Sequence, residues 1–238
     1  NVLNAPFTVA PLSASGGFAT LDCVVLPCIT ITTSGTTMFD RIIFRQLIPP
    51  SAQPLLQASG SNVHLQNCSF VNIAASALLT VSNNGTLTAT STVVHNCTLN
   101  RGFDANDVTG VTLTDVMFSN NTATGELVHL NEVGIIALTN CHWLGNTGDL
   151  VTLSTFSGAI PLAATLSGGT AVDNACNDYC LQAIDYANNV AGAVTMRAMM
   201  WKDNAQSANS NLIVVTVAQF TMRDCVVQLL AQVRSKRC

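Results

Sequence analysis

The sequence has little charge and little that suits nucleic acid or a membrane. Only 9% of its 238 residues are charged, and thirteen Asp and Glu residues outnumber nine Lys and Arg residues. The net charge of -4 excludes the basic surface that binds nucleic acid. The chain lacks a run of about 18 apolar residues, so no membrane-spanning helix is predicted. Carboxylates this sparse also offer few ways to assemble the acid pair that sugar-cleaving enzymes use.

What the sequence does contain is a repeat, seen most clearly at residues 111–121, V-T-L-T-D-V-M-F-S-N-N. Apolar residues alternate with polar ones, Asp115 interrupts the alternation, and Val116 restarts it. The pattern predicts two short strands around a bend. Variants begin at residues 63, 92, 136, 164, 194 and 220, with weaker copies near 18 and 37. Their average step of roughly 25 residues is typical of stacked repeat architectures.

When the repeats are aligned on Val116, their columns are chemically consistent. The columns of Leu113 and Phe118 are apolar and are predicted to point inward, with Trp143 and Trp201 in the core. The column of Asp115 is rich in Asn and Asp, which tolerate left-handed backbone and hydrogen-bond locally. It is predicted to form a ladder of side chains at the bend. The members of this bend ladder are Asn67, Asn96, Asp115 and Asn140.

A coil of this length cannot bury its own apolar side chains, so the coils must stack. We predict an all-β fold, a single-stranded parallel β-helix (β-solenoid) of about nine coils of roughly 25 residues over residues 18–230. Residues 1–17 would lead into the first coil, residues 173–190 would form an excursion loop, and residues 231–238 a basic C-terminal end. A β-sandwich also has short strands and frequent turns, but it does not predict the same residue type at one column in successive units.

These residues resemble the right-handed parallel β-helix, or pectin-lyase-like, superfamily. Three segments are also similar to the F-x-x-N repeats of polymorphic outer-membrane and adhesin-like proteins: Phe118-x-x-Asn121, Trp143-x-x-Asn146 and Trp201-x-x-Asn204. The companion G-G-A motif is poorly kept. The resemblance covers roughly residues 18–230. It is specific for a solenoid of stacked coils and much less specific for an activity.

The enzymes of that superfamily place their catalytic groups on an outer face. The lyases use clustered Asp residues with a basic residue. The hydrolases use a tight group of Asp residues with an N-T-D and a G-H-G motif. Here Asn146-Thr147-Gly148-Asp149 departs from the N-T-D motif, and no G-H-G motif is present. Residues 100–107, with Arg101 and Asp104, are predicted to form a protruding turn, and the histidines, His129 among them, show no metal-ligand spacing. We therefore expect no catalysis, no cofactor and no metal.

Cysteine usage indicates an extracellular or cell-surface protein, because nine cysteines accompany only two lysines. A Cys176–Cys180 disulfide is predicted, and Cys23–Cys28 is a second candidate. Five cysteines fall in the inward Val116 column as small core residues, with a bridge between adjacent coils left open for Cys68 and Cys97. These five are Cys23, Cys68, Cys97, Cys141 and Cys225. The remaining Cys238 is predicted to pair with a segment or partner outside this chain.

Four N-x-S/T sequons agree with that compartment. Asn84, in a turn, and Asn120, at the exit of a coil, are the favoured glycosylation sites. Asn67 and Asn96 are expected to carry less glycan, because their side-chain amides would be occupied in the bend ladder.

The leading functional hypothesis is a structural or adhesive module of a wall, appendage or filament, with like or neighbouring protein subunits as end-to-end or lateral partners. Glycans are further candidate partners. The alternative is a glycan- or receptor-binding solenoid that uses the loop at 173–190, where Tyr179, Tyr186, Asp178 and Asp185 are the candidate ligand-binding residues. A polysaccharide lyase or hydrolase is the third hypothesis.

Overall fold

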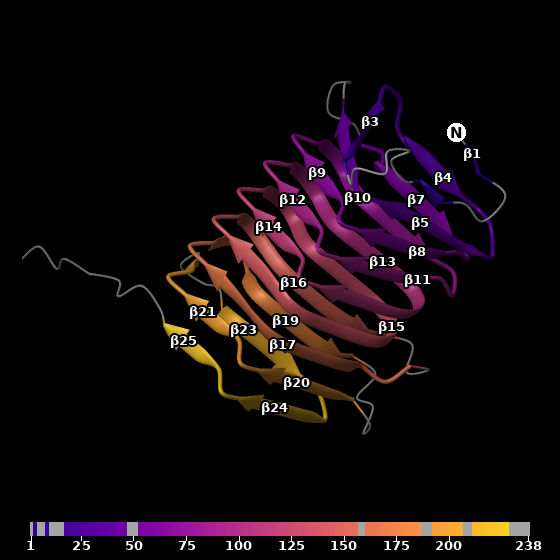
Figure 1. Cartoon of the computed structure of the whole chain (residues 1–238). Helices are drawn as coiled ribbons and strands as arrows, with labels where there is room; N and C mark the ends of the chain where they lie inside the picture. The colour runs from indigo at the N-terminus through magenta and orange to yellow at the C-terminus, as the bar shows by residue number, and fades with distance from the viewer. Residues whose placement is uncertain are drawn as a thin grey trace, which may run out of the picture.

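The computed structural model describes residues 2–3, 8–9, 17–46, 52–156, 160–186, 192–206 and 211–228. These residues form a parallel β-solenoid of about eight coils, close to the nine predicted, with 25 strands and no helix in the described part of the chain. The coils follow one another in sequence order along the stack, from the indigo N-terminal end to the yellow C-terminal end (Figure 1). Every strand pairing is parallel, as expected for a chain that wraps repeatedly in one direction.

Each coil contributes to three parallel sheets, and the long strands bend from one sheet into the next. The first sheet runs β2 (Thr8–Val9), β5 (Thr36–Asp40), β8 (Asn62–Gln66), β11 (Thr86–Thr90), β13 (Thr98–Thr114), β15 (Thr122–Leu144), β17 (Ala163–Val172), β20 (Ala193–Arg197) and β24 (Gln219–Arg223). The second runs β3 (Ala19–Cys23), β6 (Ile42–Gln46), β9 (Ser69–Val71), β12 (Val93–His95), β14 (Met117–Ser119), β15, β17, β21 (Met200–Lys202) and β25 (Val226–Gln228).

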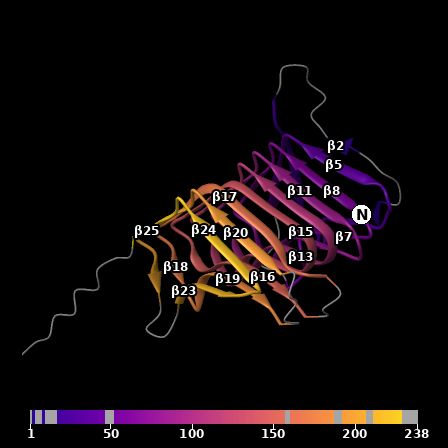
Figure 2. The same cartoon turned by 90° about the horizontal axis from the view of Figure 1, so that it is seen from below.

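The third sheet runs β1 (Val2–Leu3), β4 (Ile29–Ile31), β7 (Leu56–Ser59), β10 (Ala74–Ser82), β13, β15, β16 (Thr147–Thr155), β19 (Tyr179–Asp185) and β23 (Asn211–Thr216). Two short strands, β18 (Ala175–Cys176) and β22 (Ala205–Gln206), extend the start of this sheet after β16. Figure 2 shows β13, β15, β16 and β19 side by side on this face.

The core fills the interior of the stack because inward residues of successive coils lie in register. Phe118 pairs with Val94 before it and Trp143 after it, and all three side chains are buried. The Phe118 and Trp143 rings stack with their centroids 6.1 Å apart. Stacking therefore buries a continuous column of aromatic and aliphatic side chains that no single coil could bury.

The bend between the first and second sheets uses left-handed backbone in every described coil that makes it. The residues at this bend have φ between 49° and 64°: Arg41, Asn67, Ser91, Asp115, Asn140, Gly168, Ala198 and Asp224. Most are Asn, Asp or Gly, which accept this conformation at low cost. The bend thus explains the Asn and Asp enrichment seen in the sequence.

The predicted alignment was wrong for two coils, and one of them contains Asn96. Asn96 and Cys97 pair with the Asn120 and Asn121 positions, since Val94 and His95 pair with Phe118 and Ser119. Asn96 therefore lies at the next bend, between the second and third sheets, where its φ is 54°. The shift is five residues, and it moves Val94 from the Leu113 column to the Phe118 column; both columns point inward, so the apolar pattern hides the error.

Cys23 also leaves the predicted inward column, because it pairs with Gln46 at the end of β6. Cys68 and Cys141 keep their predicted place and are buried. The predicted protruding turn at residues 100–107 is instead part of β13. The predicted excursion loop likewise contains β18 and β19, which continue the third sheet. Terminal segments 1–17 and 231–238 lie largely outside the described residues.

A different ladder of side chains runs inside the second bend, along the asparagines of the F-x-x-N segments and Asn174. Asn121, Asn146, Asn174 and Asn204 are each at most 4% exposed. The Asn146 Nδ2 donates to the Phe118 carbonyl at 3.0 Å and to the Asn174 Oδ1 at 2.9 Å. Its Oδ1 accepts from the backbone N–H and Nδ2 of Asn121 at 2.9 and 3.0 Å. This buried ladder satisfies backbone groups that the bend takes out of the sheets.

Candidate functional site

The outer surface of the third sheet carries a dense set of chemically active side chains. Seven residues from β13, β15, β16 and β19 form what we call the polar cluster: Arg101, Asp104, Glu126, His129, Asp149, Thr152 and Tyr179. Only 9% of the chain is charged, so this concentration on one face is unusual within the molecule. The outer surface of the first sheet, by contrast, is mostly Thr, Ser and Ala between β11 and β17.

Strand register builds the cluster from residues far apart in the sequence. Asp104 pairs with His129, which pairs in turn with Thr152. Each lies between inward apolar neighbours, such as Phe103 and Ala105 around Asp104, so alternation points the polar side chain outward. Strands in a sheet are about 4.8 Å apart, which puts these side chains within hydrogen-bond reach of one another.

Gly102 lets β13 approach β15 closely beside the cluster. A Cβ atom at this position would lie 2.2 Å from the carbonyl oxygen of Leu127, so a side chain does not fit without moving the backbone. The pairing of β13 with β15 shifts register between Leu99 and Phe103, which surrounds this glycine. The irregularity lies next to Arg101 and brings its guanidinium over the following strand.

Asp104 is held by two basic groups. His129 Nδ1 lies 2.8 Å from Asp104 Oδ1, and Arg101 Nη1 lies 3.4 Å from the same oxygen. Burial alone would raise the pKa of Asp104, but the hydrogen bond from His129 and the charge of Arg101 outweigh it and lower that pKa below its ordinary value. Asp104 is consequently ionised at neutral pH.

Glu126 joins Arg101 to a tyrosine. Arg101 Nε lies 3.4 Å from Glu126 Oε2, and the Tyr179 hydroxyl donates to Glu126 Oε1 at 3.3 Å. The Thr152 hydroxyl donates to the Tyr179 oxygen at 3.1 Å. Burial, with the nearby charge of Glu126, raises the pKa of Tyr179 to about 12. The phenol therefore keeps its proton and remains a hydrogen-bond donor.

Asp149 stabilises the turn that leads into β19. Its Oδ1 accepts from the backbone N–H groups of Asn177, Asp178 and Tyr179 at 2.9–3.2 Å. The side chain is 5% exposed, and burial raises its pKa although these donors oppose the shift. In the sheet, Asp149 pairs with Glu126.

The four predicted ligand-binding residues do not form one site. Tyr179 belongs to the polar cluster, and Asp178 is exposed in the adjacent turn. Asp185 is buried and accepts a hydrogen bond from Thr155 at 3.0 Å. Tyr186 is 52% exposed and stacks on Phe156 with ring centroids 4.4 Å apart. It follows the last residue of β19, whereas Tyr179 is the first residue of that strand. Predicting them as one loop failed because β19 separates its two ends.

The structure contains both disulfides that the spacing predicted, Cys23–Cys28 and Cys176–Cys180, each with a Cα separation of 5.3 Å. The open alternative, a Cys68–Cys97 bridge, is wrong, because both are free buried thiols at different bends of the coil. Burial raises the pKa of each to about 11. Cys238 lies outside the described residues.

The sequons fall at bends of the coils. Asn84 and Asn120 are exposed, with φ of 60° and 53°. The Asn67 amide donates to Asp40 at 3.4 Å, and the Asn96 amide donates to Asn72 at 2.7 Å. Glycosylation at the four sites remains a prediction. Of the predicted bend ladder, Asp115 and Asn140 share the Asn67 bend and Asn96 does not.

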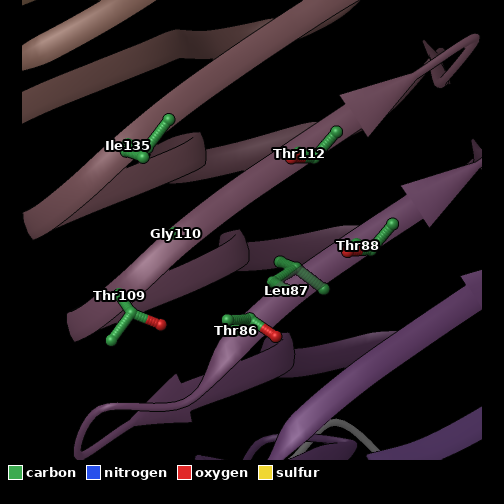
Figure 3. A pocket seen from close by; sticks show the side chains of 7 residues that line it. All are labelled: Thr86, Leu87, Thr88, Thr109, Gly110, Thr112 and Ile135. Carbon is green, nitrogen blue, oxygen red and sulfur yellow. The ribbon is translucent and has the colours of Figure 1, made fainter.

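A shallow hollow of about 250 Å³ lies on the outer surface of the first sheet (Figure 3). Gly110 leaves the space, and Leu87, Thr112 and Ile135 border it. It contains no charged side chain and is smaller than ordinary ligand pockets of about 300–1,000 Å³. The polar cluster is therefore the stronger candidate site.

Comparison of the sequence with models of known protein families and with curated proteins found no match. Among the described residues, no three or more His, Cys, Asp and Glu side chains are grouped so that they would hold a metal ion. The described residues also include no helix long and apolar enough to span a membrane.

Sequence reasoning missed the polar cluster. The local pattern predicts a turn for Arg101 and Asp104, and it shows no partner for His129 because Asp104 is 25 residues away in sequence. One signal was present: the chain has only two Glu residues, Glu126 and Glu132, and both fall on β15. Correct alignment of the third sheet would have put Glu126 beside Arg101 and Asp149.

Proposed function

We propose that this protein is an adhesive β-solenoid of an extracellular or cell-surface assembly that binds glycans through the polar cluster. The observation that carries this proposal is the concentration of hydrogen-bonding side chains from adjacent coils on the outer face of the third sheet. The two disulfides fit an oxidising compartment. The F-x-x-N segments and the parallel coils support membership in the pectin-lyase-like superfamily.

The chemistry of the cluster suits polyhydroxylated ligands. Sugar hydroxyls both donate and accept hydrogen bonds, and the cluster offers carboxylate acceptors, a guanidinium donor, and imidazole, phenol and hydroxyl groups. The row Asp104, His129, Thr152 and Gln182 spans three strand steps, or about 14 Å along the solenoid axis. An extended oligosaccharide lying along that axis would meet a new polar side chain at each coil.

Binding is favoured over cleavage by the state of the carboxylates. Glycoside hydrolysis needs a carboxylic acid that donates a proton near neutral pH, which requires a raised pKa. The pKa of Asp104 is lowered instead. The pKa of Asp149 is raised, but one of its oxygens is already occupied by three backbone N–H groups. This arrangement supports an acceptor surface rather than an acid catalyst.

The test is a glycan array with the folded protein, followed by titration of the best ligand. Asp104→Asn should weaken binding at least about tenfold, because a charge-assisted hydrogen bond is lost with little change of shape. Asp107→Asn is the matched control, since Asp107 lies exposed on the same strand outside the cluster. No glycan binding, or equal losses in the two variants, would refute the proposal.

A second candidate function, structural assembly by end-to-end stacking, has its own observation. Phe220, Met222 and Val227 occupy inward positions in the last described coil and are 41–45% exposed. Their partners in the preceding coil, including Met196 and Trp201, are buried. A further coil from a like or neighbouring subunit would bury this surface and pair the free edges of β23, β24 and β25.

Electron microscopy of the native protein tests this second function. Regular filaments that disperse when Phe220 and Met222 are replaced by Lys would support end-to-end stacking. Monomers at all concentrations, in the wild-type protein and in the variant, would exclude it without affecting the glycan-binding proposal.

A further inference from the structure

The polar cluster carries more acid than base. Asp104, Glu126 and Asp149 contribute three carboxylates, and Arg101 contributes the one permanent cation of the cluster. The formal charge is -2, or -1 when His129 carries a second proton. Asp178, exposed in the turn after Asp149, adds a further negative charge whose repulsion contributes to the raised pKa of Asp149.

The strands on either side of the cluster do not neutralise this charge. Thr80 precedes Asp104 in its column, and Gln182 follows Thr152, so the row ends in uncharged side chains in both directions. Tyr179 does not compete as an anion, since its phenol keeps its proton up to about pH 12. The face therefore has a negative potential centred on Asp104 and Glu126.

Arg101 lies between its two acidic partners, and its side chain is 36% exposed. Its Nη1 and Nε atoms lie 3.4 Å from Asp104 and Glu126 respectively. Charge-assisted hydrogen bonds between nitrogen and carboxylate are usually about 2.7–2.9 Å long, so both contacts are loose. An acidic sugar that approaches Arg101 is repelled by both of these carboxylates, whereas an ammonium group is attracted to them.

We propose that the polar cluster selects glycans that carry protonated amino groups over glycans that carry carboxylates. This inference rests on the glycan binding proposed above and adds the class of sugar. The ammonium group of the ligand would donate hydrogen bonds to Glu126 and Asp104. Because the contacts of these carboxylates with Arg101 are long, the new bonds can replace them. Hydroxyl groups of the same chain would bond to Thr152, His129 and Gln182.

The side chains of Asp104 and Glu126 are 18% and 16% exposed, so their charges are only partly screened by water. A single desolvated ammonium–carboxylate contact of this kind should favour the amino sugar over its neutral counterpart by about tenfold. The preference should shrink at high salt, because it comes from charge. A neutral chain that keeps the hydroxyl contacts should still bind, more weakly.

Titration calorimetry with three hexasaccharides tests the inference: glucosamine, N-acetylglucosamine and galacturonic acid oligomers, each at low and high salt. We expect the glucosamine oligomer to bind most tightly and the galacturonic acid oligomer least. Glu126→Gln should reduce the preference for glucosamine over N-acetylglucosamine by about fivefold or more, with little change for the neutral oligomer. Glu132→Gln is the control, because Glu132 is the other glutamate of β15 and lies outside the cluster.

Equal or tighter binding of the galacturonic acid oligomer, or an unchanged preference in Glu126→Gln, would overturn the inference while leaving glycan binding intact. Binding of none of these oligomers, together with an empty glycan array, would overturn the proposed function and the inference with it. Thermal unfolding of both variants within a few degrees of the wild-type protein verifies that the folds are comparable.

Discussion

Replacing Asn146 by Ala should destabilise the solenoid severely. Asn146 is 1% exposed and takes part in four hydrogen bonds that join three successive coils. Alanine would leave the backbone N–H of Asn121 and the carbonyl of Phe118 without these partners inside the protein. An unsatisfied buried polar group costs about 1–3 kcal/mol, so we expect a loss of about 3–5 kcal/mol in the free energy of unfolding.

Urea unfolding followed by circular dichroism measures this loss. Asn106→Ala is the matched control, because Asn106 is exposed and only accepts a hydrogen bond from the Asn131 amide on the outer surface. The control should lose less than about 1 kcal/mol. Hydrogen exchange adds a local readout, since the amide of Asn121 should lose protection in Asn146→Ala. Similar stabilities for the two variants would refute the claim that the buried ladder supports the bend.

Three further predictions concern ionisable groups. Asp149→Asn should change the free energy of unfolding at neutral pH by less than about 1 kcal/mol, because the Asn Oδ1 can accept from the same backbone N–H groups. Asp149→Ala removes this acceptor and should cost about 1–3 kcal/mol. Urea unfolding of the two variants measures the difference. The pKa of Asp104 is lower in the folded protein, so its stabilising contribution is complete above the ordinary value of 3.8 and is lost as the pH falls through the folded value. The difference in unfolding free energy between wild-type protein and Asp104→Asn should therefore shrink only in acid, and a difference that shrinks on raising the pH would contradict this assignment. Burial raises the pKa of Cys141 to about 12, so iodoacetamide should leave Cys141 unmodified in the native protein while the half-buried Cys225 reacts, as peptide mapping would show.

The fold was predictable from the sequence because its two controlling features are local. Alternation around Leu113 and Phe118 specified strands with one inward face, and the repeated Asn and Asp residues marked bends with left-handed backbone. The error at Asn96 and Cys97 has the same origin. Both bends of the coil are followed by a buried residue and preceded by an alternating strand, so the local pattern does not distinguish one bend from the other.

The polar cluster was not predictable in this way because its contacts depend on which residues stack. Gly102, Asp104 and Asp107 have the composition of a turn, and local propensity favours that reading. In the folded chain, parallel pairing with β10 and β15 overrides the propensity and makes the segment a strand. His129 meets Asp104 only through this pairing. The disulfides were accessible to prediction, since Cys23–Cys28 and Cys176–Cys180 each join residues close in sequence.

The register of the coils has a consequence for how such a surface can change. Neighbouring side chains of the third sheet belong to different repeats, so duplication or deletion of one whole coil would lengthen or shorten the row of Asp104, His129 and Thr152 by about 4.8 Å. The interior would accept the change, because inside the solenoid each coil packs against the coils before and after it. The length of ligand that the face accommodates is thus set by the number of repeats and can vary independently of the chemistry at each step.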